Sequence, residues 1–198
     1  MDQNSVSLHE MAKRAIEESI AIKQRLLETE VPKMVTAAER IARALRAHGK
    51  LVLFGNGGSA ADAQHIAAEL VGRFERERRP LPAMALTTNT STLTAIANDD
   101  DYAQIFSRQV AAWVKPEDVV AGISTSGNSA NVIEGIKTAK RLGATTIGLT
   151  GVRGGKLADC VDLCLCVPSS QTARIQESHI LIGHVICQLI ETDVMGLL

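Results

Sequence analysis

The middle of the chain reads Asp118-Val119-Val120-Ala121-Gly122-Ile123-Ser124-Thr125-Ser126-Gly127-Asn128-Ser129. The first half of this stretch is apolar and predicts a buried strand. Residues 130–142, which follow it, have apolar side chains at the i, i+3, i+4 spacing of a helix. A strand that passes directly into a helix leaves the first backbone N–H groups of that helix without partners. Because a helix N-terminus also carries a partial positive charge, this turn suits a phosphate group.

Four hydroxyl side chains surround the glycine of this turn: Ser124, Thr125, Ser126 and Ser129. Each of them can donate an O–H to a phosphate oxygen. The alternative is that Ser126 or Ser129 only caps the helix, but four hydroxyls in six residues favour the phosphate site. The turn matches neither Gly-x-Gly-x-x-Gly nor a Walker A sequence, so we expect a phosphorylated small molecule rather than a dinucleotide or ATP.

From residue 50 onward, short apolar segments alternate with helical ones. Strands are predicted at 51–54, 83–87, 118–123, 145–149 and 161–167, and helices near 59–72, 90–97, 102–114, 129–142 and 171–195. This alternation predicts an α/β fold: a parallel five-stranded sheet in a three-layer α/β/α sandwich, with the ligand at the carboxyl ends of the strands.

Two further helices are predicted before the sheet, at residues 5–28 and from Val31-Pro32 to His48-Gly49. They have more apolar surface than one sheet face needs, so they either associate between subunits or pack on the sheet. We expect a single domain over residues 1–198, with N-terminal helices at 5–48 and an α/β core at 50–198.

The charge balance excludes some classes of partner. The 21 basic and 22 acidic residues give a formal net charge of −1, which provides no electrostatic reason to expect nucleic acid or an anionic membrane. No apolar run approaches the ~20 residues that span a bilayer, and residues 1–5 lack the features of a signal peptide. We therefore expect a cytoplasmic protein.

A second glycine-rich turn, Gly55-Asn56-Gly57-Gly58-Ser59, follows the first predicted strand and begins a helix that carries His65 and Glu69. Residues four apart lie on one face of a helix. An imidazole and a carboxylate at this spacing can share a divalent metal ion, or act as a base and its orienting partner. A solvent-exposed surface pair is the alternative.

The last predicted helix places polar residues within an apolar surface. Gln176 and His184 lie within about 80° of each other on the helical wheel, and buried polar groups need partners. His184 can equally be a core histidine bonded to a carbonyl, and His179 lies on the same flank. After the second strand, Asn98-Asp99 either contacts hydroxyls of a sugar or forms a turn.

Four separated motifs, taken in order, resemble the sugar isomerase (SIS) fold and, within it, the phosphoheptose (sedoheptulose 7-phosphate) isomerase family. They are Gly55–Ser59, Asn98-Asp99, Ser124–Ser129 and Arg174–His184. The resemblance covers residues 5–195 and implies a homotetramer with active sites near subunit boundaries. It also implies one Zn²⁺ per subunit, held by His65, Glu69, Gln176 and His184. The residues that it implies contact substrate are Asn56, Gly57, Gly58, Glu69, Asn98, Asp99, Ser124, Thr125, Ser126, Ser129 and Gln176.

The same resemblance implies a reaction, the conversion of sedoheptulose 7-phosphate to D-glycero-D-manno-heptose 7-phosphate. This is the first step of the ADP-heptose route to lipopolysaccharide core sugars, with Glu69 as base and His184 as acid. One alternative is a non-catalytic SIS protein that binds the replication initiator and lacks acid–base residues at these two positions. Another is an SIS protein for a different sugar phosphate. Glu69 and His184 are both present here, which favours the enzyme.

Overall fold

Five parallel strands form one sheet in the order β2-β1-β3-β4-β5. The structure is a computed structural model that describes residues 7–196. Its strands are β1 (Leu51–Gly55), β2 (Ala83–Ala85), β3 (Val119–Ile123), β4 (Thr145–Thr150) and β5 (Leu163–Cys166). All five predicted strands are confirmed, with ends that differ by one or two residues. Because β1 lies between β2 and β3, the strand order reverses beside β1, and ligands of open α/β sheets bind at the carboxyl ends of the strands at such a point.

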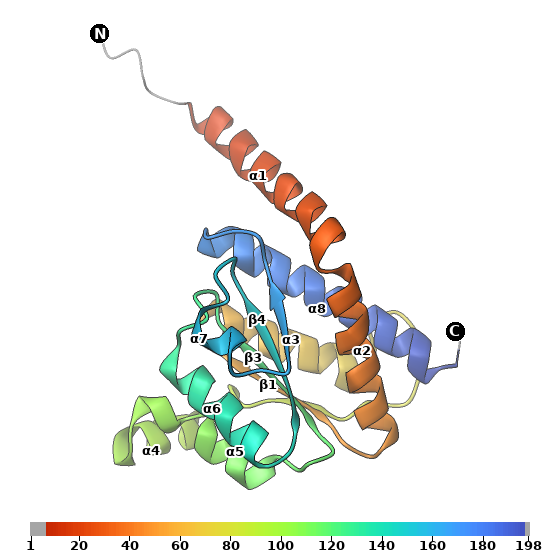
Figure 1. The fold of residues 1–198 in the computed structure, drawn as a ribbon, viewed down its shortest axis with the longest axis vertical. Coiled ribbons are helices and arrows are strands. Elements are labelled where there is room, and N and C mark those ends of the chain that lie inside the picture. The colour runs from red at the N-terminus through yellow and green to blue at the C-terminus, as the bar shows by residue number, and fades with distance from the viewer. Residues whose placement is uncertain (1–6, 197–198) are drawn as a thin grey trace.

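Helices cover both faces of this sheet (Figure 1). They are α1 (Leu8–Thr29), α2 (Val31–Arg46), α3 (Gly58–Val71), α4 (Thr90–Asp99), α5 (Ser107–Trp113), α6 (Ala130–Arg141), α7 (Gly155–Ala158) and α8 (Thr172–Val194), with a 3₁₀ turn η1 (Tyr102–Gln104). One apolar core lies between the sheet and α2, α3 and α8. The other lies between the opposite face and α5 and α6. The predicted three-layer α/β/α sandwich is confirmed.

Two helical predictions need correction. The single helix predicted at 102–114 is divided into η1 and α5, because Asp101 caps a separate turn in which the N–H of Ala103 donates to its carboxylate. The short helix α7 was not predicted. The first helix begins at Leu8, where Ser7 accepts a hydrogen bond from the N–H of Glu10 at 3.2 Å. Residues 5 and 6, where its start was predicted, lie outside the described residues.

Close packing against β3 fixes where α6 begins. A Cβ added to Gly122 would lie 2.9 Å from side-chain carbons of both Val132 and Ile136. Only glycine therefore allows α6 to lie this near the middle of the sheet. As a result, the N-terminus of α6 stands directly beyond the carboxyl end of β3, beside that of β1, with which β3 pairs in parallel.

The helices α3 and α8 run side by side in the same direction. The start of α3 at Gly58 meets Gln176, its middle at Ile66 meets Gly183, and the segment after its end at Phe74 meets Glu191. A Cβ added to Gly183 would lie 2.6 Å from Cδ1 of Ile66. This close approach joins two helices that are far apart in the sequence and creates the groove that holds the candidate site.

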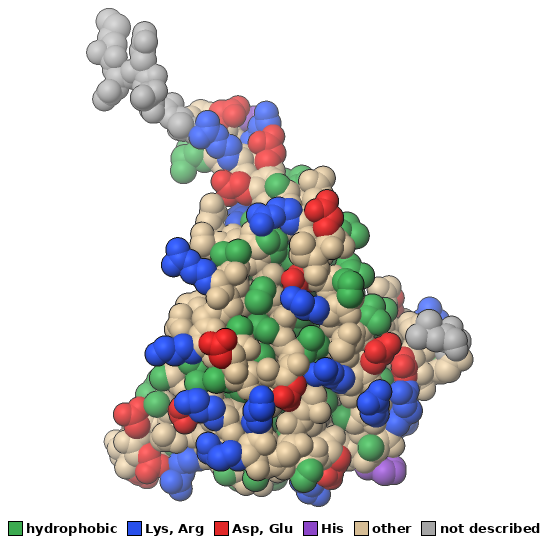
Figure 2. Space-filling view, in the orientation of Figure 1, with side chains coloured by type: hydrophobic (Ala, Val, Ile, Leu, Met, Phe, Trp, Pro, Cys, Tyr) green, Lys and Arg blue, Asp and Glu red, His purple; other side chains and the backbone are tan. Residues whose placement is uncertain are grey.

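The long helix α1 extends away from the α/β body (Figure 1). Figure 2 shows it as an arm on which hydrophobic and charged side chains are interspersed. Large apolar side chains remain exposed along it, namely Leu8, Met11, Ile16, Ile20 and Leu27. Among residues 7–196, no helix has both the length and the apolar character that crossing a membrane requires.

Candidate active site

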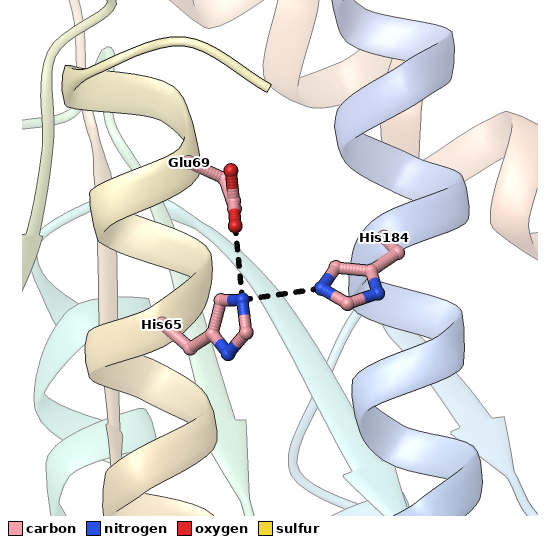
Figure 3. Close-up of side chains that lie close together, drawn as sticks. All are labelled: His65, Glu69 and His184. Atoms are coloured by element: carbon pink, nitrogen blue, oxygen red, sulfur yellow. Dashed lines mark hydrogen bonds and ion pairs between the residues drawn. The ribbon is translucent and has the colours of Figure 1, made fainter. Parts of the chain in front are cut away.

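Three side chains from α3 and α8 converge in the groove between these helices (Figure 3). Nε2 of His65 lies 2.9 Å from Oε1 of Glu69 and 3.3 Å from Nε2 of His184. One ligand atom from each residue lies within 4.8 Å of the other two. His65 is exposed, and Glu69 and His184 are partly buried, so the group is open to solvent on one side. Nitrogen and oxygen donors gathered in this way can hold a divalent metal ion.

Proton positions explain why this cluster fits a cation. A carboxylate only accepts hydrogen bonds, so the contact with Glu69 requires a proton on Nε2 of His65. The same proton cannot also form a full hydrogen bond to Nε2 of His184. A cation at the meeting point would instead receive the lone pairs of both imidazoles and the carboxylate at once. The residues present therefore fit a metal ion better than they fit a hydrogen-bonded triad.

The fourth predicted ligand, Gln176, lies further along the same groove. Its amide packs against the first residue of α3, where a Cβ added to Gly58 would come within 2.4 Å of Nε2 of Gln176. Gly58 precedes His65 by two helical turns, or about 10 Å along the axis of α3. The structure thus brings three of the four predicted ligands together and places Gln176 beside the glycine turn.

The two histidines of α8 have different surroundings. His179 is completely buried, and its Nε2 lies 3.1 Å from the carbonyl oxygen of Thr150. Burial lowers the pKa of His179 to about 4, and the hydrogen bond to Thr150 opposes this only in part. The core role that was considered for His184 therefore belongs to His179, whereas His184 faces His65.

Two helix N-termini meet at the point where the strand order reverses. α3 begins after β1 at the Gly57 N-cap, and α6 begins after β3 at the Ser129 N-cap. Neither helix has a side-chain cap among the described residues. In α3 the N–H groups of Ser59 and Ala60 already donate to carbonyls of the preceding turn, and in α6 that of Val132 donates to Oδ1 of Asn131. Within residues 7–196, the N–H groups of Gly58, Ala130 and Asn131 remain available to an anion at the carboxyl ends of two paired strands.

The serine hydroxyls of the turn face one another instead of capping α6. Oγ of Ser124 lies 3.0 Å from Oγ of Ser129 and 3.5 Å from Oγ of Ser126. Gly127 has a φ of +67°, and a Cβ there would lie 1.9 Å from the carbonyl oxygen of Gly154, so no other residue fits. Because Ser129 is the N-cap residue but makes no cap hydrogen bond, the simple capping role is not what the structure shows.

Amide side chains join the two turns. Asn56 and Asn131 exchange two hydrogen bonds, each 2.9 Å long, and the hydroxyl of Tyr102 donates to Oδ1 of Asn56 at 3.2 Å. Asn56 thus reaches across from β1 to α6. Asn131 and Tyr102 were not identified from the sequence, because a lone Asn in a helix and an isolated Tyr carry no pattern.

The other predicted substrate contacts have separate surroundings. Asn98 and Asp99 are exposed at the last turn of α4, where Nδ2 of Asn98 donates to Oδ1 of Asp99 at 2.8 Å. Gly57 has a φ of +54°, and nothing lies within 4 Å of a Cβ placed there. A pocket of about 310 Å³ adjoins Thr125 and Ser126. Its other lining residues include three that the sequence did not indicate: Arg153, Ser169 and Ser170.

Known proteins resemble this chain over nearly its whole length. The SIS domain family matches residues 16–151. The phosphoheptose isomerase of Roseiflexus sp. (strain RS-1) is 59% identical over 176 residues, which cover 89% of each chain. The chain belongs to the phosphoheptose isomerase family of SIS-domain proteins.

Solved structures of phosphoheptose isomerases share the fold of this family member. The protein from Neisseria gonorrhoeae is 48% identical, with a TM-score of 0.89 and coverage of 94% of this chain and 100% of the other. The protein from Francisella tularensis is 37% identical, with a TM-score of 0.92 and the same coverage. The similarity therefore extends over the α/β body and both helices of the candidate metal site.

Proposed function

We propose that this chain is an aldose–ketose isomerase that converts sedoheptulose 7-phosphate to D-glycero-D-manno-heptose 7-phosphate. The observation that carries the proposal is the convergence of His65, Glu69 and His184 in one groove. A separate turn, at the carboxyl end of β3, has clustered hydroxyls and unpaired N–H groups at the start of α6 that suit a phosphate. Relatives named phosphoheptose isomerase are 57–59% identical over about nine-tenths of the chain. We place the reaction at the start of the ADP-heptose route to lipopolysaccharide core sugars, in the cytoplasm.

The reaction moves one proton between neighbouring carbons. A base must remove a weakly acidic proton beside the carbonyl while an acid protonates the carbonyl oxygen, which gives an enediol. The proton is then returned to the neighbouring carbon while the other enediol oxygen loses its proton and becomes the new carbonyl. We assign the base to Glu69 and the acid to His184, which lie on either side of His65. A bound divalent ion, Zn²⁺ in our proposal, would polarise the carbonyl as a Lewis acid.

The proposed metal ligands are His65, Glu69, His184 and Gln176. Three of these side chains already converge, and a turn of its side chain away from Gly58 would carry the amide of Gln176 along the groove toward them. Two imidazoles, a carboxylate and an amide oxygen are a ligand set that Zn²⁺ accepts.

The phosphate would be held at the other end of the site. We assign it to Ser124, Thr125, Ser126 and Ser129, together with the first N–H groups of α6. Binding the phosphate end positions the sugar, so that its carbonyl end is held close to Glu69. Residues proposed to contact the remaining sugar atoms are Asn56, Gly57, Gly58, Glu69, Asn98, Asp99 and Gln176.

We further propose that the protein is a homotetramer. The apolar side chains of α1 are too exposed for an isolated subunit, since Leu8 is 84% and Leu27 is 71% exposed. Ile16 and Ile20 also line an open groove of about 320 Å³ between α1 and α8. A helix from another subunit could fill this groove and bury these residues.

A coupled assay on sedoheptulose 7-phosphate tests the proposed reaction. Glu69→Gln removes the base but keeps the size of the side chain, so we expect turnover to fall by at least about 10³-fold. Glu134→Gln is the matched control, because Glu134 forms a surface ion pair with Lys137 on α6 and should leave turnover unchanged. Wild-type turnover in the Glu69→Gln protein would contradict the assignment. An inactive wild type that co-purifies with the replication initiator would instead select the non-catalytic alternative.

A further inference from the structure

The segment that follows α3, residues 73–80, is folded around two buried charges. The side chains of Arg78 and Glu191 are 3% and 2% exposed, and Nε of Arg78 lies 2.8 Å from Oε1 of Glu191. Taking both charges out of water is costly, and their mutual attraction offsets that cost only if the remaining polar atoms also find partners. Nε of Arg78 makes only this ion-pair contact, but its NH1 and NH2 groups and both carboxylate oxygens of Glu191 have hydrogen-bond partners. One of these partners is the backbone carbonyl of Glu69.

Arg78 binds the carbonyl groups at the end of α3. Its NH2 group donates to the carbonyl of Glu69 at 2.8 Å, and its NH1 group donates to the carbonyls of Leu70 and Gly72 at 2.9 and 3.2 Å. The last carbonyls of a helix have no partners within the helix, and the final turn frays unless something binds them. The turn that Arg78 holds is the one that carries Glu69.

Glu191 holds the backbone of residues 74–76, which lies beside His184. Its carboxylate accepts the backbone N–H groups of Phe74 and Glu75 at 3.0 Å and of Arg76 at 3.2 Å. The ring of Phe74, held in this way, lies 5.5 Å from the ring of His184, with an interplanar angle of 30°. Burial raises the pKa of Glu191, but the backbone donors and Arg78 outweigh this effect, so that its pKa lies below the ordinary value and the carboxylate is charged at neutral pH.

The two ends of this arrangement share one helix face. His184 and Glu191 are seven residues apart on α8, which is two turns, so both point toward α3. One helix thus presents a proposed metal ligand and the carboxylate that anchors the segment beside it. Through Arg78, the same carboxylate also fixes the end of the helix that carries the other two ligands.

We propose that Arg78 and Glu191 are positioning residues for the metal site: the pair fixes the last turn of α3, which carries Glu69, and holds Phe74 against His184. The inference rests on the proposed function and adds to it residues that touch neither metal nor sugar. Because supporting residues around a metal site commonly change affinity by 10–100-fold, loss of the pair should be measurable in metal binding itself.

The experiment compares Arg78→Lys and Glu191→Gln with Asp193→Asn. Asp193 also forms an ion pair from α8, with Arg46, but that pair is exposed and faces α2. Arg78→Lys keeps the charge but loses the fork that reaches three carbonyls at the end of α3. Zn²⁺ affinity of the metal-free proteins is measured by competition with a coloured chelator, and kcat and KM are measured with saturating Zn²⁺.

We expect Arg78→Lys and Glu191→Gln to weaken Zn²⁺ binding by about 10-fold or more and to lower kcat by a similar factor. KM for the sugar phosphate should stay within about twofold, because the serine turn is untouched. Thermal unfolding shows which variants are folded, and Arg78→Lys decides the matter if Glu191→Gln does not fold. Asp193→Asn should match the wild type.

A folded Arg78→Lys protein with wild-type Zn²⁺ affinity and kcat would overturn the proposal. Equal losses in Asp193→Asn would also overturn it, because the effect would then be general to α8. Failure of the proposed function would give a different result. The wild type itself would then bind no Zn²⁺ in the groove and would not convert the sugar phosphate. The positioning role would fall with it.

Discussion

Nε2 of His65 and Nε2 of His184 lie 3.3 Å apart, although the two residues are separated by 119 positions in the sequence. The contact depends on how closely α3 and α8 approach each other. Gly183, the residue before His184, packs directly on Ile66, the residue after His65. The spacing of the two helices at this one glycine therefore sets the geometry of the proposed metal site.

Gly183→Ala tests that dependence. The added methyl group would lie 2.6 Å from Cδ1 of Ile66, so the helices or the Ile66 side chain must move. Overpacking of this kind costs about 1–3 kcal/mol of stability, which urea unfolding measures. We also expect weaker Zn²⁺ binding, because the two imidazoles move apart. Restored Zn²⁺ affinity in a Gly183→Ala, Ile66→Ala double variant, which removes both Ile66 carbons that the added methyl group would meet, would confirm the steric cause. Unaltered affinity in Gly183→Ala alone would show that helix spacing does not set the site.

Removal of the turn hydroxyls should affect substrate binding more than chemistry. In a Ser126→Ala, Ser129→Ala double variant, two donors to the proposed phosphate are lost, while Glu69 and His184 remain in place. We expect KM to rise by at least about 10-fold, since hydrogen bonds to a charged group contribute roughly 1.5–3 kcal/mol each. Steady-state kinetics measure the effect, and Ser170→Ala in the adjoining pocket is the comparison variant. A KM equal to that of the wild type would place the phosphate elsewhere.

His179 should make the protein less stable in mild acid. Its pKa is about 4 in the folded protein and about 6.5 in an unfolded chain. Above pH 6.5 both states are neutral and stability is complete. As the pH falls from 6.5 toward 4, the unfolded state takes up the proton first, so stability falls by an amount on the order of 3 kcal/mol.

Urea unfolding between pH 7.5 and 4.5 measures this loss of stability. In His179→Gln, which can still donate to the carbonyl of Thr150, the loss of stability over this range should be smaller than in the wild type. Identical pH dependence in the two proteins would assign the acid sensitivity to other groups.

Charges on the exposed face of α1 should disrupt the proposed tetramer. In Ile16→Glu, Ile20→Glu, two exposed apolar side chains become carboxylates that resist burial. Light scattering after size exclusion should give a tetramer for the wild type and a smaller species for this variant. The control is Arg14→Ala, Glu18→Ala on the opposite side of α1, which should remain tetrameric. Equal masses for all three proteins would remove α1 from the interface.

The fold could be predicted from the sequence because its signals are local. Apolar strands such as 119–123 and periodic helices such as 130–141 each show their type within a single segment. The break between η1 and α5 could not be predicted, since it depends on the Asp101 cap within an otherwise helical pattern. Local signals also identified the serine turn, because strand, hydroxyls and helix follow one another directly.

The candidate site was harder to predict from the sequence than the fold, because it depends on which helices become neighbours. The spacing of His65 and Glu69 placed both residues on one face of a helix, but no periodicity shows that His184 lies opposite them. Only the resemblance to phosphoheptose isomerases predicted that these three residues form one site. The role of Arg78 was even harder to predict, because the charged run 73–79 is typical of a solvated surface. In the structure the side chain of Arg78 is nevertheless only 3% exposed.

The most direct test of the central claim is X-ray diffraction at the zinc absorption edge from crystals grown with Zn²⁺ and assayed for activity. We predict one anomalous peak per subunit, about 2.0–2.2 Å from Nε2 of His65, Nε2 of His184 and a carboxylate oxygen of Glu69. Fully active crystals with no peak in this groove would contradict the account.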